Sequence, residues 1–112
     1  ALLVRTDQVN EALTIVKALR DRQDGFKRNP FSENESGYYY TRAMASWAVY
    51  EALLGYHYDM CKQEQSFEPK LNEDYFDGFW CNGRQWGVVH QRKDNDGTLY
   101  QTTEVLYDAV KM

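Results

Sequence analysis

Residues 28–47 of the chain read RNPFSENESGYYYTRAMASW. The stretch joins a short polar loop, which contains Glu33 and Glu35, to a helix-forming run in which Arg42 is followed by small and aromatic residues. Carboxylates accept hydrogen bonds from sugar hydroxyls, a guanidinium donates to ring-substituent oxygens, and tyrosine offers a flat apolar face with a polar tip. This combination indicates a carbohydrate-binding wall with Glu33, Glu35 and Arg42 as its candidate residues.

Two helix-forming segments flank this stretch. In the first, Thr6 and Asp7 offer an N-cap, apolar residues follow at helical spacing, and Gly25 lies just past the end. The second is predicted from residue 37 or 38 to residue 54, closed by Gly55, and has almost no polar face. Such a helix should be buried nearly all round, which a lone chain of 112 residues could hardly achieve. We therefore expect a piece of a larger domain that begins in the middle of its structure.

After Gly55 the hydrophobic pattern changes from helical spacing to alternation. Strands are predicted at residues 65–68, 75–81, 84–91 and 99–107. Asn82-Gly83 predicts a two-residue hairpin loop, because both residue types tolerate positive φ. Residues 94–97 predict a second turn. They do not form an EF-hand, because Arg92 stands where the first acidic ligand belongs and Thr103 where the bidentate glutamate is required.

Composition excludes several classes of function. The net charge is −4 and the charges are interspersed, so no basic stripe is available to neutralise nucleic-acid phosphates. No apolar run approaches the roughly 18 residues of a membrane span. Cys61 and Cys81 could pair or remain free thiols, and their spacing identifies no zinc site. The sequence calls for no cofactor and no metal.

The run RNPFSENESGYYYTRAMASWAVYEALLGYHYD, residues 28–59, resembles a motif near the C-terminal end of the catalytic domain in glycoside hydrolase family 116. That family contains β-glucosidases and non-lysosomal glucosylceramidases. The flanking segments VNEALTIVKALRDRQDG, SFEPKLNEDYFDGFW and GRQWGVV are similar to those of the family as well. The resemblance implies an (α/α)₆ barrel around a sugar pocket and a mechanism that retains anomeric configuration.

The resemblance also implies roles for individual residues. A glutamate of the motif and an arginine nine residues later hold the hydroxyls at the far side of the glucose ring, and these match Glu33 and Arg42. Glu35 matches the second acid of the motif. The family's glutamate nucleophile and aspartate acid/base match no residue of this chain, so we expect no catalytic residue here and no activity from the fragment by itself. The chain departs from the motif with Ser32 for Asn, Ser36 for Cys and Tyr39 for His.

The predicted fold class is an α+β fragment: two to three helices from an (α/α)₆ barrel (residues 1–55), followed by a small antiparallel β-meander (residues 56–112), together one partial domain. The predicted function is that of a C-terminal fragment of a retaining β-glycosidase, which supplies part of the sugar-binding wall. Its expected partners are a glucoside or related carbohydrate and the remainder of the catalytic domain.

Two alternatives stay open. Glu33 and Glu35 could cap the second helix, or pair with Arg42 in a structural ion pair, without any sugar. The chain could also be a non-enzymatic carbohydrate-binding or interaction module, in which Tyr75, Phe79, Trp80 and Trp86 form an aromatic platform.

Overall fold

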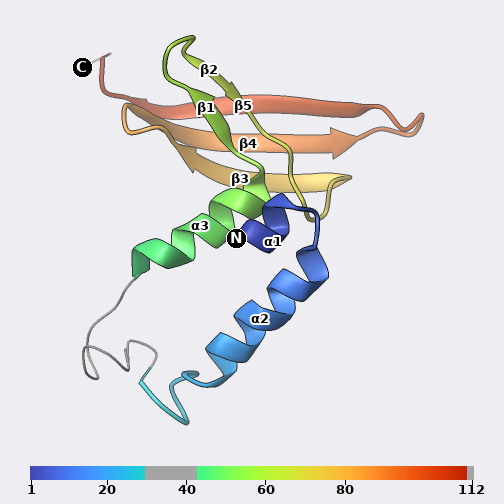
Figure 1. The fold of residues 1–112 in the computed structure, drawn as a ribbon. Coiled ribbons are helices and arrows are strands. Elements are labelled where there is room, and N and C mark those ends of the chain that lie inside the picture. Colours follow the sequence, from blue (N-terminus) through green and yellow to red (C-terminus); the bar gives the residue numbers. More distant parts are fainter. Residues whose placement is uncertain (30–42, 111–112) are drawn as a thin grey trace. The chain divides into compact units, whose positions relative to one another are not determined.

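The computed structural model describes residues 1–29 and 43–110. The chain divides into two compact units, Ala1–Ala52 and Leu53–Met112, and each is described by itself. Figure 1 shows the helices and strands of both units with their labels.

The first unit is helical. It contains α1 (Leu2–Arg5), α2 (Val9–Asp21) and most of α3 (Ala43–Leu54). The prediction that Thr6 or Asp7 caps α2 is wrong: the N-cap residue is Gln8, and no side chain caps the helix. The hydroxyl of Thr6 is engaged elsewhere, because it donates to the carbonyl oxygens of Leu2 and Leu3 at 3.1 Å and so closes α1.

The helix α3 carries the AMASW run and is not buried all round in this chain. Residues 45–48 are exposed, and the indole of Trp47 is 57% exposed. Arg20 on α2 donates from Nη2 to Ser46 Oγ at 2.8 Å, which joins the two helices that flank residues 30–42 in the sequence. An apolar helix surface of this kind is typical of a helix that other parts of a larger protein cover.

The second unit contains two antiparallel sheets. The strands β1 (His57–Asp59) and β2 (Glu64–Ser66) form the smaller sheet. The larger sheet has the order β3 (Tyr75–Cys81), β4 (Gln85–Lys93) and β5 (Leu99–Asp108), with β4 in the middle (Figure 1). Antiparallel sheets of this kind commonly pack one face and leave the other face open.

One face of the larger sheet is packed. Trp80 and Val89 are 2% and 0% exposed, and Leu54 is 1% exposed. The ring of Phe67, just after β2, lies 6.2 Å from that of Trp80, so the segment that follows the smaller sheet covers this face. We call this surface, which comprises Phe76, Gly78, Trp80, Gly87, Val89 and Gln91 of β3 and β4, the packed face.

Gln91 is the polar residue buried in the packed face, and its amide is bonded at both ends. Its Nε2 donates to the carbonyl oxygen of Glu73 at 2.7 Å, and its Oε1 accepts from Gln101 Nε2 at 2.9 Å. Gln101 Nε2 also donates to the carbonyl oxygen of Phe67 at 3.2 Å. Because a buried amide without partners is costly, this chain of hydrogen bonds explains how the packed face tolerates a glutamine.

Gly87 is required by close contact within the packed face. A Cβ at this position would lie 1.9 Å from the backbone oxygen of Glu104 and 3.1 Å from the ring of Trp80. Trp80 is the cross-strand partner of Gly87, so the indole lies where another residue would place its own side chain. The register shift between Trp86 and Gly87 is a bulge at the same place.

The predicted fold class is wrong. The described residues are mostly β, with five strands in two antiparallel sheets, and they show no barrel helices. One of the three helices is a single turn of four residues. The barrel followed from the family resemblance and not from the residues of the chain, and no helix follows Leu54 in the described part.

The first hairpin turn lies one residue later than predicted. Asn82 N donates to the carbonyl oxygen of Gln85 at 3.1 Å, so the two loop residues are Gly83 and Arg84. Gly83 has φ +84°, whereas Asn82 does not have positive φ. A glycine at the first central position is what a type II′ turn requires. The second predicted turn is confirmed: Asp94 N donates to the carbonyl oxygen of Thr98 at 3.0 Å.

Candidate functional site

The three residues predicted to bind sugar, Glu33, Glu35 and Arg42, lie outside the described residues. Their convergence on a hollow therefore stays a prediction. The described helix α3 begins at Ala43, which follows Arg42 directly in the sequence.

The candidate site within the described residues is the second face of the β3–β4–β5 sheet, which we call the open face. It consists of Tyr75, Asp77, Phe79 and Cys81 on β3, Trp86, Val88, His90 and Arg92 on β4, and Tyr100, Thr102, Glu104 and Tyr107 on β5. Residues that stand directly opposite each other in an antiparallel sheet carry their side chains on the same face. The burial pattern agrees, since each of the open-face residues on β3 is exposed and Trp80 between them is not.

The half of the open face next to the Gly83-Arg84 turn is aromatic. The rings of Trp86 and Tyr107 are stacked, with centroids 3.9 Å apart and an angle of 11° between their planes. Trp86 is 40% exposed and Phe79 is 43% exposed. Trp80 belongs to the packed face, so its predicted place in an aromatic platform is wrong. The aromatic half of the open face therefore consists of Phe79, Trp86 and Tyr107, whereas Tyr75 stands opposite Arg92 in the other half.

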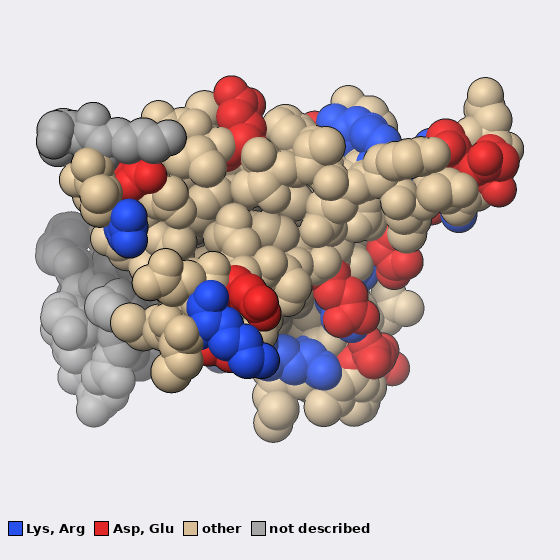
Figure 2. Space-filling view, turned by 90° about the horizontal axis from the view of Figure 1, so that it is seen from above, with Lys and Arg blue, Asp and Glu red and all other residues tan. Residues whose placement is uncertain are grey.

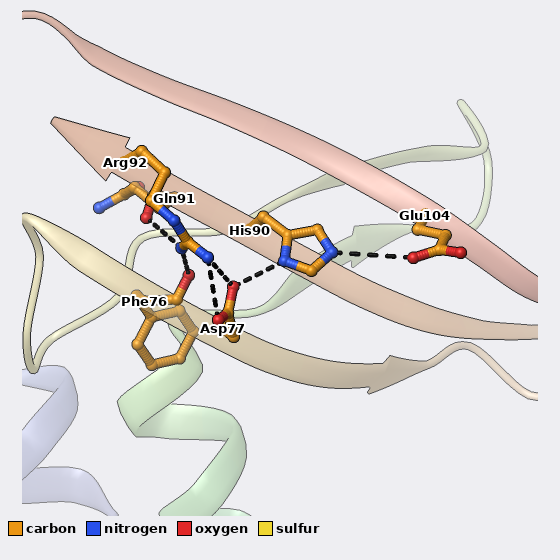
Figure 3. A network of polar contacts seen from close by, with 6 residues as sticks. All are labelled: Phe76, Asp77, His90, Gln91, Arg92 and Glu104. Carbon is orange, nitrogen blue, oxygen red and sulfur yellow. Dashed lines mark hydrogen bonds and ion pairs between the residues drawn. The ribbon is translucent and has the colours of Figure 1, made fainter. Parts of the chain in front are cut away.

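The other half of the open face carries a network of polar side chains from all three strands of the sheet (Figure 3). Arg92 on β4 donates from Nη2 to Asp77 Oδ1 and Oδ2 at 2.7 and 3.0 Å. His90 Nδ1 lies 2.6 Å from Asp77 Oδ1, and His90 Nε2 lies 3.8 Å from Glu104 Oε2 on β5. One carboxylate of β3 thus holds two residues of β4, and the imidazole points toward a second carboxylate on β5.

Arg92 is held from several sides. Its Nη1 donates to the carbonyl oxygens of Phe76 and Gln91 at 2.8 and 2.7 Å. Its guanidinium carbon also lies 3.7 Å from the centroid of the Tyr75 ring, which is a cation–π contact. A guanidinium with so many bonds is positioned by the sheet and has few donors left for a ligand.

The network sets the protonation of Asp77. The hydrogen bond from His90, and after it the hydrogen bonds from Arg92, lower the pKa of Asp77 below its ordinary value. Because an ionised carboxylate only accepts hydrogen bonds, the proton of the short contact lies on His90 Nδ1. The contact with Asp77 holds the imidazole ring of His90 in place on the sheet.

An open hollow adjoins Tyr75. Its lining is the loop from Lys70 to Tyr75, which contains Asn72 at φ +51° and the carboxylates of Glu73 and Asp74. Lys93 donates from Nζ to Asp74 Oδ1 at 3.0 Å and so ties this loop to β4. The hollow is open to solvent, and it offers polar groups next to an aromatic ring.

The described part of the chain contains neither a disulfide nor a candidate metal cluster. Cys61 and Cys81 are free and exposed, so the alternative of a disulfide between them is wrong. No group of three or more His, Cys, Asp or Glu residues within residues 1–29 and 43–110 is arranged to hold a metal ion. In the same part of the chain, no helix combines the length and apolar character that crossing a membrane requires.

The polar network was not predicted from the sequence. A usable signal existed in the turn: with Gly83-Arg84 as the loop, Asp77 stands opposite His90, and Tyr75 stands opposite Arg92. If the loop were Asn82-Gly83, as predicted, Asp77 would stand opposite Val88, and the polar network could not form.

Comparisons with known proteins leave the family open. The chain matches no family model, and neither the search of curated proteins nor the search of solved structures gave a significant match.

Proposed function

We propose that this chain supplies part of the sugar-binding wall of a retaining β-glycosidase of the β-glucosidase or glucosylceramidase type. The observation that carries the proposal is the spacing of Glu33, Glu35 and Arg42 ahead of the AMASW run. The resemblance to glycoside hydrolase family 116 implies that the carboxylate of Glu33 and the guanidinium of Arg42 act as acceptor and donor for sugar hydroxyls, which is chemistry that both groups can supply. The catalytic carboxylates belong to the rest of the protein, because the motif that resembles the family carries no nucleophile or acid/base.

The described helices support the proposal at one point. Ser46, within the AMASW run, accepts the hydrogen bond from Arg20 at 2.8 Å. This bond connects the helices that precede and follow residues 30–42 in the sequence. Binding residues are commonly found in segments that a rigid scaffold holds at both ends.

The surface of α3 supports a larger assembly. Its exposed residues 45–48 are alanine, serine and tryptophan, and none of them is charged. In the proposed enzyme this surface is covered by the remainder of the catalytic domain, which would bury the half-exposed indole of Trp47.

The test uses the intact enzyme that contains this chain. Arg42→Ala and Glu33→Gln should each lower kcat/KM for an aryl β-glucoside by a factor equivalent to about 1.5–3 kcal/mol, the range for a lost charge-assisted hydrogen bond. Matched controls are Arg22→Ala and Glu64→Gln, because both residues are exposed and lie outside the motif. Unchanged kcat/KM in both motif variants rejects the assignment.

A second candidate function is favoured by the exposed rings of the open face. Tyr75 is 66% exposed, Phe79 is 43% exposed and Trp86 is 40% exposed. Aromatic rings beside hydrogen-bonding groups are what a non-catalytic carbohydrate-binding module presents. On this reading the chain by itself binds soluble oligosaccharides, and Trp86→Ala removes that binding. Calorimetric titration with β-glucan oligosaccharides that shows no heat of binding excludes this second function.

A further inference from the structure

The strand β5 forms an edge of the larger sheet. It is the longest strand of the described part and has β4 on one side only in the strand order there. Residues 99–106 are exposed without interruption, on both faces of the sheet. An edge strand presents a row of backbone donors and acceptors that can pair with another strand.

The alternation of hydrogen-bonded and non-bonded pairs along the β4–β5 hairpin determines which residues of β5 present free-edge backbone donors and acceptors. In an antiparallel pair, bonded and non-bonded residue pairs alternate. Asp94 N donates to the carbonyl oxygen of Thr98, so the alternation turns the backbone groups of Leu99, Gln101 and Thr103 away from β4. Lys93 stands opposite Leu99 in a non-bonded pair. Its N–H therefore points away from β5 and donates to the carbonyl oxygen of Asp74, just before β3.

Little on β5 prevents such pairing. Its sequence, LYQTTEVLYD, has no lysine, arginine or proline, which are the residues that usually protect an edge. Four of its large apolar side chains are about half exposed, namely Leu99, Tyr100, Val105 and Leu106. Figure 2 shows acidic residues at the projecting end of the molecule, and further acidic and basic residues spread among uncharged ones over the rest of the view. The bulge opposite Trp86 and Gly87 disturbs only the last third of the strand.

We propose that β5 pairs antiparallel with β5 of a second copy of this chain, so that two three-stranded sheets join into one of six strands. The two-fold axis passes between the two Thr103 residues, whose outward backbone groups then exchange two hydrogen bonds. This register places Gln101 opposite Val105 and Thr102 opposite Glu104. No like charges face each other, whereas an axis at Glu104 would oppose two carboxylates.

The experiment exploits the difference between two neighbouring threonines, both exposed. Thr103→Lys places two ammonium groups opposite each other on the axis, and Thr102→Lys places each ammonium opposite a Glu104 carboxylate. Sedimentation equilibrium of the chain over a concentration series, with reductant because Cys61 and Cys81 are exposed, measures dimer dissociation. We expect Thr103→Lys to weaken the dimer about tenfold or more, and Thr102→Lys to leave it unchanged or tighter.

Several outcomes overturn the proposal: a wild-type chain that is monomeric over the whole series, equal weakening by both lysines, or no effect of Thr103→Lys. Thr103→Glu repeats the like-charge test with the opposite sign if the lysine variant does not fold. Hydrogen exchange on the wild-type chain gives an independent measurement. The amides of Gln101 and Thr103 should be protected more strongly as concentration rises, and equal exchange at all concentrations contradicts the pairing.

Discussion

The packed face and the open face of the β3–β4–β5 sheet are built from alternate residues of the same strands, yet they differ in chemistry. On the packed face, Trp80 and Val89 are buried, and two glycines make room for neighbouring side chains. On the open face, Asp77, His90 and Arg92 are joined in a network beside exposed rings. Strand alternation by itself separates the two roles.

The comparison teaches which substitutions should affect folding and which should affect recognition. A residue on the packed face contributes through burial and close contact, so changing it costs stability. A residue on the open face is bonded mainly to its cross-strand neighbours, in water, where each contact contributes little to folding. The open face is therefore where side chains can be chosen for binding without loss of the fold.

The largest difference is expected between two tryptophans. Trp80→Ala should lower the free energy of unfolding by about 3–5 kcal/mol, because it leaves a cavity where an indole is buried. Trp86→Ala should cost about 1 kcal/mol, the scale of its stacking on Tyr107. Urea unfolding of both variants checks this. Equal losses of unfolding free energy in the two variants would mean that the packed face and the open face contribute equally to stability.

A smaller difference is expected between two glycines. Gly87→Ala should cost about 3 kcal/mol, because its Cβ meets a backbone oxygen of β5 that cannot rotate away. Gly97→Ala lies at φ +90° in a turn, with only the end of the Lys93 side chain nearby, and should cost about 1 kcal/mol from backbone strain. Thermal unfolding ranks the two. A milder Gly87→Ala would show that the strands separate locally at the bulge.

The smallest effect is expected on the open face and depends on pH. Asp77 has a folded-state pKa lowered by His90 and Arg92, so its contribution is present above the unfolded-state pKa and is lost as pH falls through the folded value. The stability difference between wild type and Asp77→Asn should thus shrink on acidification below about pH 4. Denaturant midpoints at several pH values measure it. A difference independent of pH would mean that the network contributes no charge effect.

Much of the secondary structure could be predicted from the sequence. Alternation with turn residues on both sides places β3 at residues 75–81 and β5 within one residue of its end. Alternation does not predict the short strands β1 and β2. No strand is predicted at β1, and the strand predicted at residues 65–68 is displaced from β2. Each of these strands has only three residues, most of them polar, which is too short for an alternating pattern. The barrel was wrong because it came from the resemblance, and local patterns do not determine how helices are arranged.

Less of the candidate site could be predicted. The aromatic residues were identified, but Trp80 was grouped with Tyr75 and Phe79 although it has the opposite parity on β3. The polar network depended on the turn. An error of one residue in the loop moves every cross-strand partner by two positions, which replaces His90 by Val88 opposite Asp77.

The same turn has a consequence for how the protein ages. Asn-Gly steps are prone to deamidation, in which the backbone nitrogen of the glycine attacks the asparagine amide carbon and expels ammonia. Here the side-chain oxygen of Asn82 accepts hydrogen bonds from the N–H groups of Arg84 and Gln85 at 3.0 and 2.8 Å. These bonds restrict rotation of the side-chain amide. Deamidation at this residue should consequently be slow while the hairpin is closed. The extent of Asn82 deamidation in stored protein, measured by peptide mass spectrometry, should therefore report the total time that the hairpin has been open.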